Sequence, residues 1–159
     1  MFLLRDIFPF ISRGKRLKTA DHISGSTPYV SSSAINNGVD DFIGNTEHIR
    51  TFSDCLTIAN SGSVGTPFYH NYLFIASDHV TALKNPKINI YSYLFVASVL
   101  RKFQKKYNFN REINDVRIKK ESIPLPTDKN GNPDWNYMEQ YTKRILLSMK
   151  EQYLKKKME

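Results

Sequence analysis

Two glycine-containing stretches of this sequence hold the residues best suited to polar recognition chemistry. The first stretch, SSSAINNG, offers Ser31, Ser32, Ser33, Asn36 and Asn37. The second stretch, NSGSVGTPFY, offers Ser61, Ser63, Thr66 and Tyr69. Asparagine can pair with adenine through two hydrogen bonds, and serine or threonine can reach either base edge in the major groove. The same residue types are common in turns, so the residues alone leave turn and binding site equally open.

Gly62 and Gly65 could let the backbone approach a phosphate closely, because glycine has no Cβ atom. A nucleotide-binding P-loop needs the pattern G-x-x-x-x-G-K-[ST], which this stretch lacks. No basic residue follows Gly65 closely enough to neutralise a nucleotide phosphate. The stretch is therefore not a P-loop, and its glycines are expected to form a turn that either joins strands or also binds a partner.

Basic residues concentrate in two segments of a chain whose formal net charge is +8. Residues 1–20 hold five basic residues against one acid, and residues 101–120 hold eight against two. The candidates for phosphate contact are Arg13, Lys15, Lys18, Arg111 and Arg117. Such an uneven charge distribution is typical of proteins that contact nucleic-acid phosphates. A solvated helix face is the alternative explanation for the same charges.

Motifs of enzymes and metal sites are missing from the sequence. The four histidines form no H-E-x-x-H pattern and no close pair, so we expect no metal site and no cofactor. Cys55, the single cysteine, lies in an apolar run, which predicts a small buried residue rather than a nucleophile. No G-x-S-x-G elbow occurs, nor the motifs of a DNA methyltransferase or a metal-dependent nuclease. We therefore expect a chain that catalyses no reaction by itself.

Neither a signal peptide nor a membrane helix is expected. The opening MFLLRDIFPF contains charges and a proline, and no later run reaches the about 18 apolar residues that a membrane helix requires. The lone cysteine excludes an internal disulfide and fits a reducing compartment. These features predict a cytoplasmic protein.

The chain of 159 residues, 40% of them hydrophobic, is expected to fold as one globular domain. Up to residue 83, short apolar runs alternate with Gly, Pro, Asn and Ser, which predicts strands and tight turns. The expected strands are Tyr29–Ser32, Cys55–Ala59, Thr66–Tyr69, Leu73–Ile75 and Val80–Leu83. From Asn89 the apolar residues recur at helical spacing, which predicts a helix. Val116, Ile118 and Ile123 suggest one further short strand.

A long C-terminal helix is predicted after the loop PTDKNGNPDW. Asn132 can cap the helix and Pro133 suits its first position, so the helix is expected to run to about Lys157. Its apolar positions include Met138, Tyr141, Ile145 and Met149, spaced three and four residues apart. Such a stripe either packs on the domain of the same chain or pairs with another chain, and the spacing alone leaves both open.

Four segments, in order, resemble a known family of DNA-recognition proteins. LRDIFPFISRGKRL, TPYVSSSAINNGVDDFIG and CLTIANSGSVGTPFYHNYLFIASDHVTAL resemble the target recognition domain of Type I restriction-modification specificity subunits. SIPLPTDKNGNPDWNYMEQYTKRI resembles the specificity subunits or domains of Type IIB and Type IIG systems of the BcgI kind. The resemblance extends from about Leu4 to Ile145.

The resemblance implies an α/β (α+β) fold, with a twisted, mostly antiparallel β-sheet and flanking helices, followed by a long helix. It implies a target recognition domain at residues 1–131 and a dimerisation or spacer helix at residues 132–159. The loops would bind one half of a bipartite site in double-stranded DNA. The helix would pack against a second such helix and dock DNA adenine methyltransferase (M) subunits, with restriction (R) subunits as further partners. The chain itself would be a non-catalytic specificity subunit.

The resemblance also leaves the assembly open. A full specificity subunit has two recognition domains and two helices, whereas this sequence has one of each. It corresponds to a half-subunit that forms a homodimer, to one half of a split gene, or to a piece of a longer protein. If two copies pair through the helix, twofold symmetry predicts an inverted-repeat target. The competing interpretation is a protein-interaction module that binds methyltransferase subunits without reading DNA.

Overall fold

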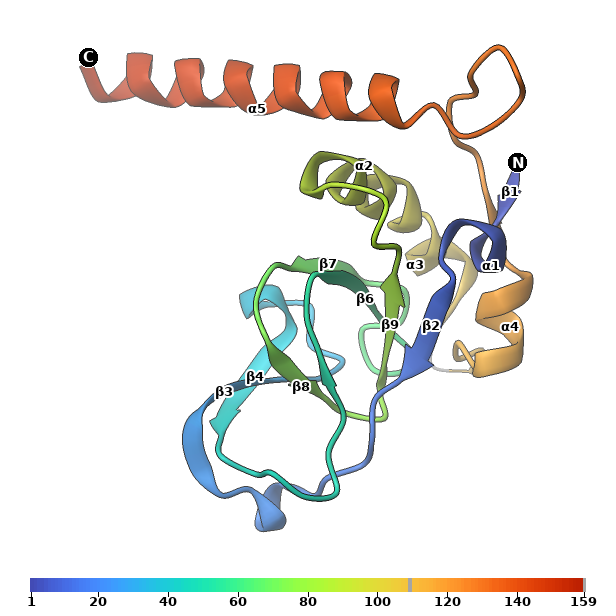
Figure 1. The fold of residues 1–159 in the computed structure, drawn as a ribbon. Coiled ribbons are helices and arrows are strands. Elements are labelled where there is room, and N and C mark those ends of the chain that lie inside the picture. Colours follow the sequence, from blue (N-terminus) through green and yellow to red (C-terminus); the bar gives the residue numbers. More distant parts are fainter. Residues whose placement is uncertain (109, 159) are drawn as a thin grey trace.

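The computed structural model describes residues 1–108 and 110–158 and is drawn as a ribbon in Figure 1. Its helices are α1 (Leu4–Ile7), α2 (Ile90–Leu100), α3 (Phe103–Lys106), α4 (Asp115–Lys120) and α5 (Trp135–Met158), with short 3-10 turns η1 (Thr19–Asp21) and η2 (Asn36–Gly38). Its strands are β1 (Phe2–Leu3), β2 (Phe10–Arg13), β3 (Ser24–Val30), β4 (Val39–Ile43), β5 (Thr51–Phe52), β6 (Cys55–Ala59), β7 (Pro67–His70), β8 (Phe74–Ala76), β9 (Val80–Lys84) and β10 (Ser122–Ile123).

Within the described residues, eight of the strands form two four-stranded sheets. One sheet has the order β2-β9-β6-β7, and all its neighbours run antiparallel. The other sheet has the order β4-β3-β8-β5, in which only β3 and β8 run parallel. The short strands β1 and β10 pair separately. The predicted α+β fold with mostly antiparallel strands is confirmed, with the strands divided between two sheets.

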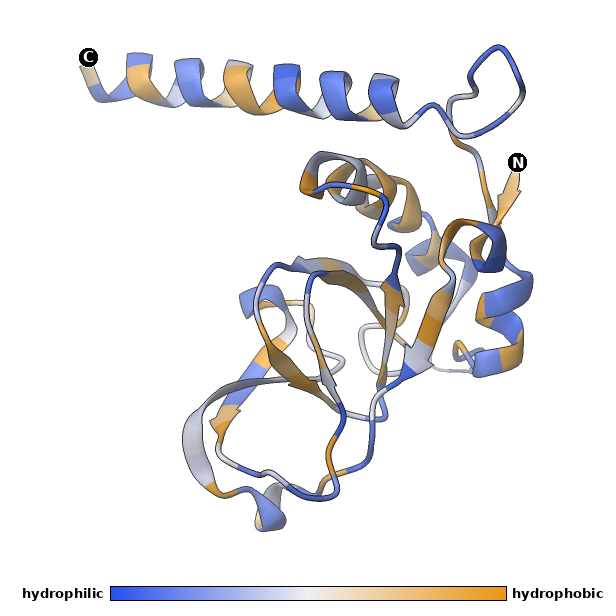
Figure 2. Cartoon of the chain, viewed as in Figure 1, coloured by the Kyte–Doolittle hydropathy of each residue, from blue (hydrophilic) through white to orange (hydrophobic). Residues whose placement is uncertain are grey.

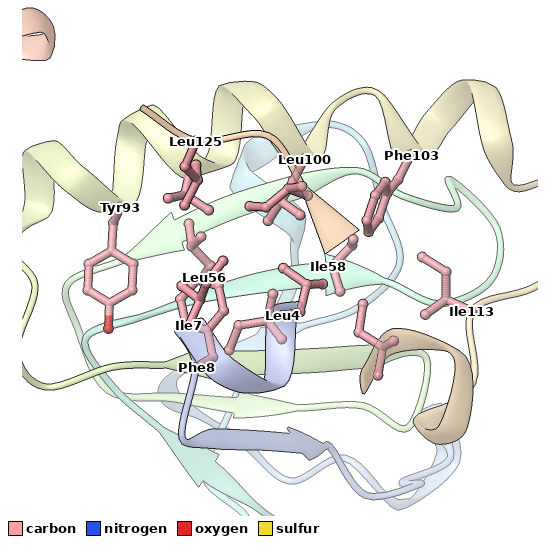
Figure 3. Packing of buried hydrophobic residues seen from close by; sticks show 14 of the residues in the cluster. Leu4, Ile7, Phe8, Leu56, Ile58, Tyr93, Leu100, Phe103, Ile113 and Leu125 are labelled. Carbon is pink, nitrogen blue, oxygen red and sulfur yellow. The ribbon is translucent and has the colours of Figure 1, made fainter. Parts of the chain in front are cut away.

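Strand β6 is buried on both faces, and this explains its continuous apolar run. Leu56 and Ile58 belong to the main core, which α1, α2 and α3 cover, as Figure 3 shows. Cys55 points to the opposite face and packs with Phe74 and other residues of the second sheet. Alternate side chains of a strand point to opposite faces, so one short strand joins the helical layer to the second sheet.

The segment predicted as a strand around Val116 and Ile118 is instead helix α4, so that prediction is wrong. The side chain of Asn114 accepts hydrogen bonds from the backbone amides of Val116 and Arg117 and caps the helix. Ile118 is buried in the main core, whereas Val116 is exposed. Only Ser122–Ile123 is extended, where it pairs with β1. Capping by Asn114 and burial of Ile118 therefore stabilise a helix here, although the β-branched residues of the segment favour a strand.

Helix α5 begins at Trp135, two residues later than the predicted start at Pro133. The carboxylate of Asp134 accepts a hydrogen bond of 2.8 Å from the backbone amide of Tyr137, so Asp134 caps the helix. Pro133 precedes the helix and forms an isolated β-bridge with Thr127. Polar and apolar bands alternate along α5, and its C-terminal half extends past α2 away from the strands (Figures 1 and 2).

Candidate nucleic-acid interface

The hairpin turn between β6 and β7 depends on two glycines with left-handed backbone conformations. Gly62 has φ +57° and Gly65 has φ +82°. A Cβ atom on Gly65 would lie 2.8 Å from the backbone nitrogen of Gln104. The amide of Gly65 donates to the carbonyl of Ala59 at 2.9 Å, which closes the turn. The prediction that the glycines form a turn between strands is confirmed.

The two polar stretches lie side by side, although the 21 residues 39–59 separate them in the chain. The backbone amide of Ser63 donates to the carbonyl of Ser32 at 3.2 Å. A Cβ atom on Gly62 would lie 2.8 Å from Ser32 Oγ. Ser31, Ser32, Ser33, Ser61 and Ser63 are half-buried, and Asn36 is exposed. The fold therefore gathers these side chains at one place.

The turn Ser77–His79 between β8 and β9 touches all three predicted segments. The amide of Ser77 donates to the carbonyl of Val30 at 2.9 Å, beside the serine stretch. The imidazole Nδ1 of His79 lies 2.6 Å from Ser61 Oγ in the hairpin turn. A Cβ atom on Gly14 would lie 2.1 Å from the carbonyl oxygen of Ser77, so the basic segment passes directly against this turn. Sequence reasoning missed it, although a polar Ser-Asp-His tripeptide between two apolar strands marks an exposed turn.

A cavity of about 260 Å³ opens between the basic segment, the serine stretch and the β8–β9 turn. Residues from the basic segment, β3, the serine stretch, β4 and the β8–β9 turn line it: Arg16, Leu17, Lys18, Thr19, Tyr29, Ser31, Ser32, Asp40, Ser77, Asp78 and His79. Lys15 and Lys18 are exposed, so both ammonium groups are free to contact phosphates. The cavity thus combines two basic side chains, two carboxylates and several short polar side chains.

Four of the predicted contact residues bind other side chains or backbone groups of this chain: Arg13, Asn37, Thr66 and Tyr69. Arg13 forms a 3.0 Å ion pair with Asp115. The hydroxyl of Thr66 is buried and accepts a 2.8 Å hydrogen bond from the side chain of Gln104. Tyr69 donates to the carboxylate of Asp54 at 2.5 Å, and its ring stacks on that of Tyr93. Burial, followed by this hydrogen bond, raises the pKa of the Tyr69 hydroxyl.

Asn37 positions the serine stretch rather than projecting from it. Its amide group donates to the Tyr72 hydroxyl at 3.0 Å and to the carbonyl of Tyr69 at 3.3 Å. The neighbouring His70 is fully buried, and its Nε2 lies 2.8 Å from Thr57 Oγ1. Burial lowers the pKa of His70 to about 4, so the imidazole is neutral near pH 7. This cluster fixes η2 against strand β7.

The second basic segment is anchored at the same hairpin. The amide of Ile113 donates to the carbonyl of Asn60 at 3.0 Å. The guanidinium of Arg111 lies 5.5 Å from the centre of the Tyr107 ring, and that of Arg117 donates to the carbonyl of Glu112 at 2.7 Å. Both arginines are exposed, so their outer faces are accessible to a ligand.

The single cysteine lies in the core of the second sheet. Cys55 is fully buried, as predicted, and burial raises the pKa of its thiol to about 12. Among residues 1–108 and 110–158, no three His, Cys, Asp or Glu side chains gather closely enough to hold a metal ion. No helix of the described part of the chain has both the length and the apolar character needed to span a membrane.

The predicted helix stripe divides into an anchor and a projecting part. Met138 is fully buried in the main core, so its side chain is unavailable to a partner. Tyr141 packs edge-on against Phe95 of α2, with ring centres 5.6 Å apart. Ile145 and Met149 are 46% and 60% exposed, although both are large and apolar. Packing on the same chain is therefore confirmed for Met138 and Tyr141, whereas pairing of Ile145 and Met149 with another chain stays a prediction.

Residues 1–155 match the Type I restriction modification DNA specificity domain. The chain belongs to this family. The resemblance inferred from the sequence segments is thereby confirmed over almost the whole chain. The description of the family is that of a DNA specificity domain.

Relatives of this specificity domain are known in sequence and in structure. The chain is 35% identical over 146 residues to S.BcgI, the specificity subunit of a Type II restriction enzyme from Heyndrickxia coagulans; the match covers 91% of this chain and 42% of that protein. It shares its fold with a Type I S subunit from M. genitalium (TM-score 0.65, 20% identity, 98% of this chain and 40% of that chain). HsdS from Thermoanaerobacter tengcongensis has the same TM-score at 15% identity, covering 92% of this chain and 36% of that chain. The specificity domain described here thus spans less than half the length of these relatives.

Proposed function

We propose that this chain is the DNA specificity subunit, or half-subunit, of a restriction-modification system. In this role it binds one half of a bipartite target in double-stranded DNA and catalyses no reaction itself. It directs partner chains, which are a DNA adenine methyltransferase (M) and restriction (R) subunits. The observation that carries the proposal is a cavity lined by the basic segment, the serine stretch and the β8–β9 turn, which also contacts the hairpin through His79, in a chain of the specificity-domain family.

The side chains of this interface are suited to different kinds of DNA contact. Lys15 and Lys18 contact phosphates, which sets affinity and orientation without selecting a sequence. Ser31, Ser32, Asn36, Ser61 and Ser63 lie on the adjoining loops and are the candidates for contact with base edges. Arg111 and Arg117 extend the phosphate contacts along the DNA. Arg13, Asn37, Thr66 and Tyr69 support these loops from behind through the contacts described above.

The recognition domain at residues 1–131 is followed by the spacer helix at residues 132–159 in this proposal. The helix pairs with a second helix through Tyr141, Ile145 and Met149, which are partly exposed large hydrophobic side chains. The second helix belongs to another copy or to a second half-subunit. A homodimer would present two identical recognition domains in opposite orientations, and its target would be an inverted repeat.

Selection from a library of randomised DNA duplexes tests the proposal. The purified chain is incubated with the library, bound duplexes are recovered and sequenced, and the cycle is repeated. We expect enrichment of one short motif and binding that weakens steeply as salt rises. Loss of adenine methylation at the same motif, after deletion of the gene in its host, would connect the motif to a methyltransferase. A library that stays unenriched contradicts the proposal.

The exposed stripe on α5 supports a second candidate, a protein-interaction module that binds methyltransferase subunits without reading DNA. The two candidates differ in the same selection. The interaction module would leave the library unenriched and would still co-purify with a methyltransferase subunit through α5. Variants Ile145→Asp and Met149→Asp would abolish that co-purification in either case, because a charge opposes burial in an apolar interface.

A further inference from the structure

We propose that Asp78, in the β8–β9 turn, reads a base pair by accepting a hydrogen bond from an exocyclic amino group. The ligand group is the N4 amino group of cytosine or the N6 amino group of adenine, at the major-groove edge. This inference rests on the proposed DNA-binding function and deepens it, since it assigns a base chemistry to one residue. Sequence patterns pointed to the serine and hairpin stretches but not to this turn.

The turn occupies the centre of the proposed interface. Ser77 is bonded to Val30 beside the serine stretch, and the amide of Asn60 in the hairpin donates to the carbonyl of His79 at 2.8 Å. The amide of Lys15 donates to the carbonyl of Ala76 at 3.0 Å, at the point where the turn begins. A DNA duplex that contacts the basic segment and both polar loops would therefore lie close to the turn that carries Asp78.

The carboxylate of Asp78 has its hydrogen-bonding capacity available. Its nearest ion-pair partner is His79, whose Nε2 lies 3.8 Å away, beyond hydrogen-bond length. Its side chain is 29% exposed and lines the cavity together with Lys18 and Ser32. Among the hydrogen bonds of the described residues, none ends on this carboxylate, although the backbone carbonyl of Asp78 accepts one from Asn60.

A carboxylate on a surface that binds DNA is unfavourable unless it meets a donor, because phosphates repel it. An ionised carboxylate only accepts hydrogen bonds. The major-groove donors of DNA are the amino groups of cytosine and adenine, whereas guanine O6 and thymine O4 are acceptors. Asp78 would therefore attract cytosine or adenine and repel guanine or thymine at one position. Asp40 lines the same cavity from β4, so the carboxylates there oppose phosphate entry and favour a base edge.

The turn is rigid enough to position the carboxylate. The hydroxyl of Ser77 accepts a 3.1 Å hydrogen bond from the amide of His79, and the amide of Val80 donates to the carbonyl of Ser77 at 3.2 Å. The side chain of Asn60 accepts a 2.9 Å bond from Thr81 in the adjoining strand. Because hydrogen bonds hold the turn on both sides of Asp78, the carboxylate loses little conformational freedom on binding a base, which favours selectivity.

The test compares the full chain with its Asp78→Ala variant by selection from a randomised duplex library. Alanine removes the acceptor without adding a donor, whereas asparagine could itself pair with adenine. We expect discrimination at one base pair of the motif, and at that base pair alone, to fall about tenfold in Asp78→Ala, a factor that corresponds to about 1.4 kcal/mol. A C·G or an A·T pair at that position identifies cytosine or adenine as the donor. The other positions stay unchanged, and thermal melting verifies that the variant is folded.

Asp6→Ala is the matched control, because it removes the same charge from α1 at a side chain that is 65% exposed. It is expected to leave every position of the motif unchanged. If Asp78→Ala selects the wild-type motif with unchanged discrimination at every position, the assignment of Asp78 is overturned and the proposed function stands. A wild-type library without enrichment overturns the proposed function, and the assignment falls with it. A change spread over all positions also overturns the assignment, since it indicates a general charge effect.

Discussion

The recognition loops and helix α5 use their side chains in opposite ways. In the loops, some polar side chains that suit DNA contact instead form hydrogen bonds within the chain, as Asn37 and Thr66 do. In α5, large apolar residues that suit a core lie partly exposed, as in Ile145 and Met149. Residue type therefore says what a side chain can do, and neighbouring elements decide whether it is free to do it.

The physical reason for the contrast is the density of neighbouring backbone. The loops lie where two sheets and the segment before α4 converge, so buried polar groups must find partners within the chain. In the described part of the chain, helix α5 packs mainly on α2, and its side chains from Ile145 and Met149 onward are partly exposed. The effect of a substitution should therefore decrease from the most tightly packed position to the most exposed one.

Gly65→Ala should have the largest effect on stability. The new Cβ would meet the backbone at 2.8 Å, and the residue would also hold φ +82°. Adding a backbone clash to left-handed strain should lower the free energy of unfolding by about 4 kcal/mol. Gly131→Ala is the control, because it has φ +81° with open space around the Cβ position. It should cost about 1 kcal/mol in urea titrations, and equal losses in the two variants would contradict a tightly packed hairpin.

Met138→Ala and Met149→Ala should separate the anchor of α5 from its projecting part. Met138 is fully buried, so its truncation should cost about 3 kcal/mol of unfolding free energy. Met149 is 60% exposed, and its truncation should change stability by at most about 0.5 kcal/mol. Chemical denaturation at low protein concentration measures both. A large loss for Met149→Ala under those conditions would mean that the outer helix is already covered in the isolated chain.

Acidification should weaken the cluster that positions the serine stretch. His70 has a pKa of about 4 in the folded chain, below its value of about 6.5 when unfolded. The unfolded chain therefore binds the proton more strongly, and stability falls as the pH drops from about 6.5 to 4. The loss attributable to His70 should be about 2 kcal/mol at pH 5. His70→Gln should be less stable at pH 7 and should lose this part of the pH dependence; an unchanged dependence would assign it to other groups.

Lys18→Ala should have the smallest effect, confined to DNA binding. Loss of one phosphate contact should reduce the slope of log K against log salt by about 0.9 without altering the selected motif. Fluorescence anisotropy with a duplex of unrelated sequence measures the slope. Lys129→Ala removes the same charge from the exposed loop before α5 and should leave the slope unchanged. Equal slopes for the wild type and Lys18→Ala would move the phosphate contacts away from the basic segment.

The sequence predicted several elements because their information is local. The apolar runs of β6 and β9 and the helical spacing of α2 and α5 correspond to observed elements, since each buries a regular face. Strands β1, β2, β4 and β5 were not predicted; β1 and β5 are only two residues long, and β4 carries two adjacent acids. The strand predicted at Val116 failed because capping by Asn114 favours a helix there. These differences come from side-chain bonds that composition does not reveal.

By itself, the sequence determined the family, the mixed α+β fold and the glycine turn, because motif order, periodicity and backbone freedom are properties of consecutive residues. Only the tertiary structure decided that Asn37 faces inward, that Met138 belongs to the core and that Asp78 lies at the meeting point of three loops. The reason is that hydrogen-bond partners and burial depend on residues distant in the chain. Exposure of a side chain is decided by what packs around it.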